Sequence, residues 1–75
     1  MAREDNKLRL LAAIKQPPGA ALVAYDTAEL ADAVQLSRSY AAQLLWELHG
    51  EGRARHMVSD SDGANLWCDP RGDRL

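Results

Sequence analysis

The sequence contains no phenylalanine, a single cysteine and no apolar run long enough to cross a membrane. One cysteine, Cys68, cannot form an internal disulfide, which argues against a small secreted fold held by disulfides. Cys and His residues also lack the spacing of a metal site. A membrane span needs about 18 apolar residues, and the charged start of the chain lacks a signal-peptide core. We therefore expect a cytoplasmic protein that has no cofactor and no membrane partner.

The sequence also lacks an excess of basic residues. Nine Lys and Arg residues stand against eleven Asp and Glu residues, for a net charge of -2. Binding to nucleic acid through charge alone is therefore disfavoured, although a local basic face is not. With 75 residues the chain forms one domain with a thin core, in which a large catalytic cleft is hard to build.

No residue has the surroundings of a catalytic group. His49 and His56 lie near no evident nucleophile, and Cys68 falls on an expected strand without a helix N-terminus to activate it. His56 could follow a phosphate backbone together with Arg53 and Arg55 on the same expected strand, but it is read as an ordinary strand residue rather than as a switch. We expect that the protein is not an enzyme.

The first half of the chain predicts a helix over residues 3–15, followed by a short strand over residues 20–25. The helix has one apolar stripe, made of Leu10, Leu11 and Ile14. A Pro-Pro-Gly sequence at 17–19 ends it, because proline lacks the amide proton and restricts its predecessor. The strand is predicted from Val23 and Tyr25.

A second, short helix is predicted after Asp26. Asp26 and Glu29 have the spacing of a capping box, in which each side chain accepts a hydrogen bond from the other residue's backbone amide. The helix ends near Val34, and Ser37 is placed to cap the next one. Gln35 occupies a turn position that is usually glycine; if the backbone there is left-handed, glutamine costs about 1 kcal/mol.

The longest periodic segment predicts a third helix from Arg38 to about Glu51. It has a complete apolar face, made of Ala41, Leu44, Leu45 and Leu48. Gly52 follows its end and is free to adopt a positive φ.

The C-terminal part predicts a β-hairpin. Two short strands, 53–58 and 65–69, are separated by a loop in which Asp62-Gly63 is a strong turn signal. The tail 70–75 is expected to be frayed, so the single domain 1–75 would be ordered over about 3–69. The predicted fold class is α+β, in the order helix, strand, helix, helix, strand, strand.

The segment 27–46 resembles the helix-turn-helix pattern, with small Ala31 at the helix crossing and a Leu-Ser-Arg-Ser string at 36–39. With the flanking elements, nearly the whole chain resembles a winged helix-turn-helix DNA-binding domain. Its layout is similar to that of small stand-alone regulators of bacterial fimbrial and plasmid operons, and the stretches 52–55 and 63–67 are similar to their wing strands. The resemblance implies a three-helix core, a hairpin wing and a third helix that enters the major groove.

The residue types on the third helix suit that role. Arg38 can bond guanine and Gln43 can bond adenine, while hydroxyl groups and strand arginines can contact phosphates. The candidate DNA-binding residues are Ser37, Arg38, Ser39, Tyr40, Gln43, Arg53 and Arg55. The leading hypothesis is a sequence-specific regulator of transcription, of bacterial or phage origin, with double-stranded DNA as its partner.

Trp46 lies off the apolar face of the third helix and leaves an alternative open. It is either a contact surface, most simply of a homodimer, or packs against the wing near Trp67. The rival function is a protein-interaction module that uses Trp46 and the acidic wing tip, Asp60 and Asp62, without binding DNA directly. Charge placement separates the two, because DNA binding needs several cations on one face: Lys7 or Arg9, with Arg38, Arg53 and Arg55.

Overall fold

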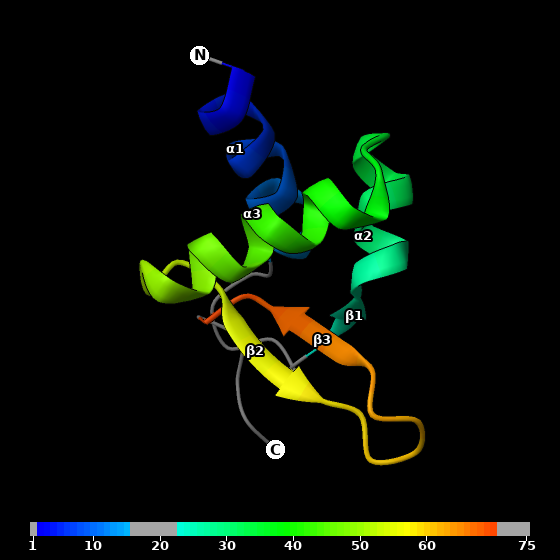
Figure 1. The fold of residues 1–75 in the computed structure, drawn as a ribbon. Coiled ribbons are helices and arrows are strands. Elements are labelled where there is room, and N and C mark those ends of the chain that lie inside the picture. The colour runs from blue at the N-terminus through cyan, green and yellow to red at the C-terminus, as the bar shows by residue number, and fades with distance from the viewer. Residues whose placement is uncertain (1, 16–22, 71–75) are drawn as a thin grey trace.

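The computed structural model describes residues 2–15 and 23–70. Its elements are α1 (Ala2–Ile14), β1 (Tyr25–Asp26), α2 (Thr27–Val34), α3 (Arg38–Gly50), β2 (Arg55–Val58) and β3 (Asn65–Cys68), as Figure 1 shows. The predicted α+β order is confirmed. The expected break at 17–19 and the tail beyond residue 70 lie outside the described residues.

The strands are shorter than the sequence predicts. Residues 20–22 of the expected first strand are outside the described part, and β1 begins only at Tyr25, where pairing with Trp67 begins. Arg53 is not in β2, because its amide still donates to the carbonyl oxygen of Leu48 and closes the end of α3. β3 ends at Cys68, which pairs with Arg55 at the start of β2.

The three strands form one antiparallel sheet in the order β1-β3-β2, so β3 is central. The β2–β3 hairpin is the wing, and its register pairs His56 with Trp67. Gly63 has a φ of 72° and its amide donates to the carbonyl oxygen of Ser59, which turns the chain at the wing tip. Among the described residues Gln35 is the only non-glycine residue with a positive φ, so Asp62 does not share the left-handed conformation of Gly63.

The caps predicted around α2 are confirmed. The Asp26 carboxylate accepts from the Glu29 amide at 2.7 Å, and the Glu29 carboxylate accepts from the Asp26 amide at 3.0 Å. Gln35 is left-handed, with φ 58° and ψ 45°, which lets the amide of Leu36 donate to the carbonyl oxygen of Ala31 at 2.9 Å. This turn sets the direction in which α3 leaves α2 (Figure 1).

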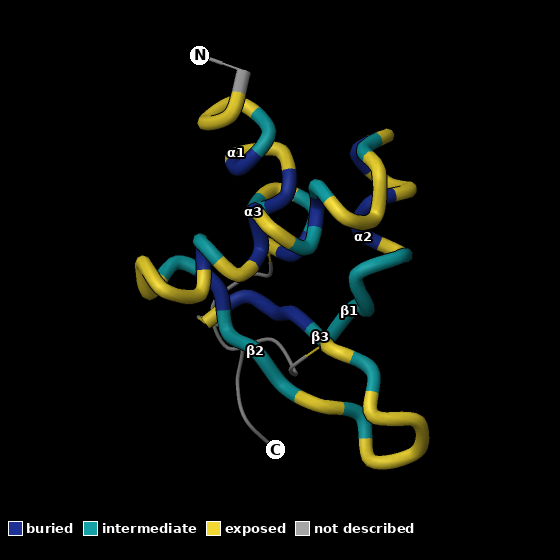
Figure 2. Tube along the Cα trace, viewed as in Figure 1, coloured by how far each residue is buried: buried dark blue, intermediate teal, exposed yellow. Residues whose placement is uncertain are grey.

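The core lies between the three helices and the adjoining face of β3 (Figure 2). Its buried cluster comprises Leu10, Ile14, Leu30, Val34, Leu44, Leu45, Leu48, Ala54 and Trp67. Ala31 is also buried, as expected at the helix crossing. Burial of one face of α3 against α1 and α2 leaves the opposite face exposed, next to the wing.

Candidate nucleic-acid interface

The outer face of α3 is a continuous exposed surface that runs from the start of the helix to its last turn. Its exposed side chains are Arg38, Ser39, Gln43, Trp46 and His49. Ser37 is also exposed, but its hydroxyl accepts a hydrogen bond from the amide of Tyr40 at 3.2 Å and acts as the helix cap. Tyr40 is half-buried and packs against the core cluster. The structure thus places three predicted DNA-binding side chains, Arg38, Ser39 and Gln43, on one exposed helix face.

Trp46 is 44% exposed in the middle of this face. Its ring meets Trp67 edge-on, with ring centroids 4.9 Å apart and an interplanar angle of 87°. Trp67 is fully buried, and its Nε1 donates to Oγ1 of Thr27 at 2.9 Å. Of the two alternatives left open for Trp46, the structure shows packing against the wing at Trp67. The ring still presents a large apolar surface to solvent.

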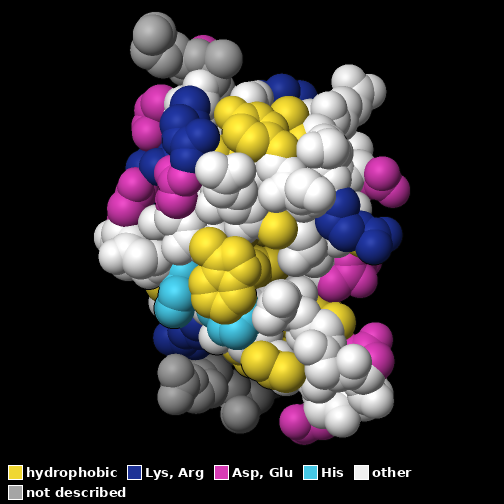
Figure 3. Space-filling view, in the orientation of Figure 1, with side chains coloured by type: hydrophobic (Ala, Val, Ile, Leu, Met, Phe, Trp, Pro, Cys, Tyr) yellow, Lys and Arg dark blue, Asp and Glu magenta, His cyan; other side chains and the backbone are white. Residues whose placement is uncertain are grey.

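Two histidines complete a cluster of four rings. The centroid of His56 lies 4.5 Å from that of Trp46, and the centroid of His49 lies 5.9 Å from it. Figure 3 shows both imidazoles beside the hydrophobic patch in the middle of this face, with charged side chains toward its edges. Sequence reasoning offered the contact of Trp46 with Trp67 as one alternative but missed the two histidines. His49 is one helical turn from Trp46 on α3, and His56 joins the cluster through its pairing with Trp67.

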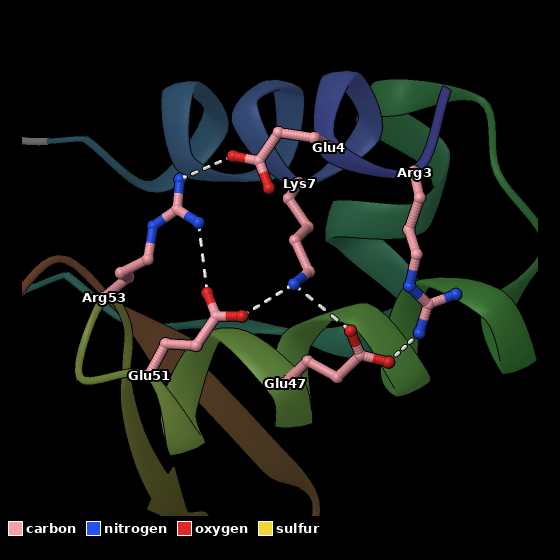
Figure 4. A network of polar contacts seen from close by, with 6 residues as sticks. All are labelled: Arg3, Glu4, Lys7, Glu47, Glu51 and Arg53. Atoms are coloured by element: carbon pink, nitrogen blue, oxygen red, sulfur yellow. Dashed lines mark hydrogen bonds and ion pairs between the residues drawn. The ribbon is translucent and has the colours of Figure 1, made fainter. Parts of the chain in front are cut away.

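Most basic groups near the end of α3 are held in one ion-pair network (Figure 4). Lys7, which is 7% exposed, lies between Glu47 at 3.2 Å and Glu51 at 2.7 Å. Arg53 bridges Glu51 and Glu4, at 3.0 Å each. The full network is Arg3, Glu4, Lys7, Glu47, Glu51 and Arg53. It ties α1 to α3 and neutralises most of its own charge.

The network shifts the pKa values of Glu51 and Arg53. Hydrogen bonds from Lys7 and then Arg53 lower the pKa of Glu51. The pKa of Arg53 is raised, first by its hydrogen bond to Glu4 and then by that to Glu51. Arg53, a predicted phosphate contact, thus forms ion pairs with two carboxylates of the protein itself.

The remaining basic candidates do not converge with the network. Arg9 donates through Nη2 to the carbonyl oxygen of Val34 at 2.6 Å, at the end of α2. Arg55 is half-buried, and its Nη1 atom is fully buried with no hydrogen-bond partner among the residues that the structure describes. Arg38 is at the start of α3 and Glu51 follows its end, about 20 Å away along a helix of this length. Arg38 and the ion-paired Arg53 are therefore at opposite ends of α3.

Arg38 borders a groove of about 300 Å³ between the start of α2, the start of α3 and the tip end of β3. The groove is lined by Asp26, Thr27, Ala28, Arg38, Ala64 and Asn65. The Asp26 carboxylate there is engaged as the α2 cap, so Arg38 supplies a positive group beside a concave surface. The lining of the groove thus holds one cation, Arg38, and one carboxylate, Asp26.

The described residues contain neither a metal-binding cluster nor a membrane-spanning helix. Over residues 2–15 and 23–70, His, Cys, Asp and Glu side chains nowhere gather in groups of three or more that could hold a metal ion. None of the helices described there has the length and apolarity that a membrane span requires.

Comparison with known proteins identifies the fold. No family model matches the chain, and no curated protein matches it. A similar solved structure is that of Cyprinid Herpesvirus3 ORF112-Zalpha in its binding mode to Z-DNA, with a TM-score of 0.60 and 22% identity. The match covers 89% of this chain and 95% of that one. Together with the order of its helices and strands, this likeness shows that the chain has a winged-helix fold.

Proposed function

We propose that the protein binds a nucleic-acid duplex through the outer face of α3 and the adjacent wing, with Trp46 at the centre of the contact. The observation that carries this proposal is the exposed Trp46 ring, supported from below by buried Trp67. A large aromatic surface left exposed on so small a domain typically marks a contact site. Its rigid support lets the ring meet a sugar or base without losing further conformational freedom.

The surrounding side chains provide the polar part of the contact. Arg38 and the exposed hydroxyl of Ser39 would hold phosphates at the start of α3, next to the groove that Ala64 and Asn65 line on the wing. Gln43, one turn after Ser39, is within the same exposed stripe. Because Lys7 and Arg53 are paired within the protein, the expected contact relies on shape and apolar surface more than on charge.

The first duplex to test is left-handed Z-DNA. The similar winged-helix structure is that of a protein domain bound to Z-DNA, and the likeness extends over 89% of this chain. An interface that depends on shape and on one apolar ring also suits recognition of duplex form rather than of base sequence.

A second candidate is the sequence-specific regulator of transcription, which would read B-form DNA in the major groove. It is favoured by the exposure of both Arg38 and Gln43 on the first two turns of α3, since these side chains can form bidentate bonds to guanine and adenine. In this case two copies of the chain would bind a symmetric site, and a homodimer would be required.

A binding titration separates these functions. Labelled duplexes of three kinds would be titrated at low salt: alternating dC-dG locked in the Z form, the same sequence in the B form, and a pool of random B-form duplexes. Preference for the Z form supports recognition by shape, and selection of one sequence from the pool supports the regulator. Failure to bind any of them overturns the proposal and favours a protein partner at Trp46. Sedimentation of the parent and Trp46→Ala tests the homodimer, which would bury the same ring.

A further inference from the structure

We propose that His49 and His56 contact phosphate groups of the bound duplex in their protonated form, so that binding takes up protons. This inference rests on the proposed function, because it assigns a role to residues of the same face. In the sequence, His56 was grouped with Arg53 and Arg55 as able to follow a phosphate backbone, whereas His49 had no binding role; a charge change in either histidine was not part of that hypothesis.

The geometry places both imidazoles on the proposed contact surface. Their centroids are 5.8 Å apart, and both lie next to the exposed ring of Trp46 (Figure 3). His49 is exposed on α3, and His56 is half-buried on β2. A duplex seated on Trp46 would therefore bring its backbone within reach of either ring.

In each imidazole, one ring nitrogen lies within hydrogen-bond distance of a protein oxygen. Nδ1 of His49 lies 3.4 Å from the carbonyl oxygen of Ala54, and Nε2 of His56 lies 2.8 Å from Oδ1 of Asn65. Oxygens of this kind accept hydrogen bonds, so the ring nitrogen facing each of them is the donor. The other nitrogen, Nε2 of His49 or Nδ1 of His56, is where a second proton would be added. Protonation therefore keeps both existing hydrogen bonds and adds a donor and a positive charge.

Over residues 2–15 and 23–70, no ion pair joins either imidazole to a carboxylate. On α3, Glu47 and Glu51 are paired with Lys7 in the ion-pair network. On the wing, the Asp62 carboxylate accepts from the amide of Ala64. The groups that face the rings from α3, β2 and β3 are Trp46, Asn65, Trp67 and the other histidine, all without negative charge.

A phosphate would provide the missing negative charge. Histidine is the side chain that ordinarily changes charge between pH 5 and pH 8, and an imidazolium is a strong donor to phosphate oxygens. The face has few other cations, since Lys7 and Arg53 are engaged in the network. Linkage then requires that duplex affinity rise as the pH falls, with uptake of at most about two protons per complex.

The experiment measures affinity for one labelled duplex, the tightest found above, between pH 8 and pH 6. The parent is compared with His49→Gln, His56→Gln and the double variant, because glutamine keeps a polar side chain but cannot be charged. Thermal unfolding and tryptophan fluorescence of each variant establish that it is folded. Calorimetry in two buffers with different ionisation enthalpies gives the proton uptake directly.

We expect the parent to bind about 10-fold more tightly at pH 6 than at pH 8, each single variant to lose part of this change, and the double variant to lose nearly all of it. Binding by the parent that does not depend on pH, or an equal pH dependence in the double variant, overturns the role of the histidines and leaves the proposed function standing. Absence of binding at every pH overturns the proposed function itself.

Discussion

Trp46 and Trp67 form an edge-to-face pair that joins the exposed surface of α3 to the interior of the protein, with ring centroids 4.9 Å apart. Trp67 is fully buried and is fixed by its hydrogen bond to Thr27 at the start of α2. The exposed ring therefore rests on the same residue that joins the sheet to the helices. A contact side chain held in this way is positioned before its ligand arrives.

The first prediction concerns Trp46→Ala. We expect duplex affinity to fall about 10-fold or more, because an aromatic contact to a nucleic-acid base contributes about 1–3 kcal/mol. The ring is already 44% exposed, so its removal should lower the thermal unfolding midpoint much less than a core truncation would. Fluorescence anisotropy with a labelled duplex measures the affinity.

Leu8→Ala is the matched control for this variant. Leu8 is 50% exposed on α1, where it borders a different groove, together with Ile14 and Pro70. Its truncation also removes exposed apolar surface but should leave duplex affinity unchanged. Equal losses of affinity in the two variants would contradict the role assigned to Trp46.

The second prediction separates two arginines that the sequence could not distinguish. Arg38→Ala should reduce the slope of log affinity against log salt by about one, since it removes one phosphate contact. Arg53→Ala should leave that slope unchanged, because Arg53 is paired with Glu4 and Glu51, and should lower thermal stability instead. Affinity measured at four salt concentrations tests both. A reduced slope in Arg53→Ala alone would reverse the assignment.

The third prediction concerns the turn of the helix-turn-helix. Gln35 has a φ of 58°, a region that costs a residue with a side chain about 1 kcal/mol relative to glycine. Gln35→Gly should therefore raise the free energy of unfolding by up to about 1 kcal/mol. Gly52, with a φ of 76° and open space around it, provides the converse test, since Gly52→Ala should lower that free energy by about 1–2 kcal/mol through backbone strain alone. Chemical denaturation measures both; a destabilised Gln35→Gly would mean that its side chain has a role beyond the turn.

The fourth prediction concerns stability in acid. The pKa of Glu51 is lowered in the folded protein, first by its hydrogen bond from Lys7 and then by that from Arg53. A carboxyl group of this kind contributes stability that is fully present above its unfolded pKa, about 4.3, and is lost as the pH falls through its lower folded pKa. Below about pH 4.3 the parent should thus lose stability more steeply than Glu51→Gln. Asp60→Asn, at the exposed wing tip, is the control and should retain the steep loss. Thermal unfolding midpoints between pH 3 and pH 6 measure the difference, and parallel curves for the parent and Glu51→Gln would contradict it.

The helices and their caps were predictable from the sequence because they depend on neighbours within one or two turns. The Asp26–Glu29 capping box and the Ser37 cap are set by spacings of three residues. The apolar face of α3 follows from its helical period, and together these features defined the helix-turn-helix. The exposure of Arg38 and Gln43 follows from the same period.

The site could be predicted only in part, because its other contacts join residues far apart in the chain. Lys7 donates a hydrogen bond to Glu51, and Arg53 donates one to Glu4. These two cations, which the sequence analysis considered for phosphate contacts, instead link α1 to the end of α3. The ring cluster depends on the wing register, which sets His56 opposite Trp67. A shift of that register by one residue would turn His56 to the other face of the sheet. The sequence around the hairpin alone does not fix the register.

The most direct test of the proposed interface maps the contact surface itself. Amide resonances of the labelled protein would be recorded by nuclear magnetic resonance during titration with the tightest-binding duplex. We expect the largest shifts along the exposed face of α3, in β2 and at Ala64 and Asn65 of the wing, together with the indole resonance of Trp46. Shifts confined to α1, around Leu8, with the α3 resonances unchanged, would contradict the account.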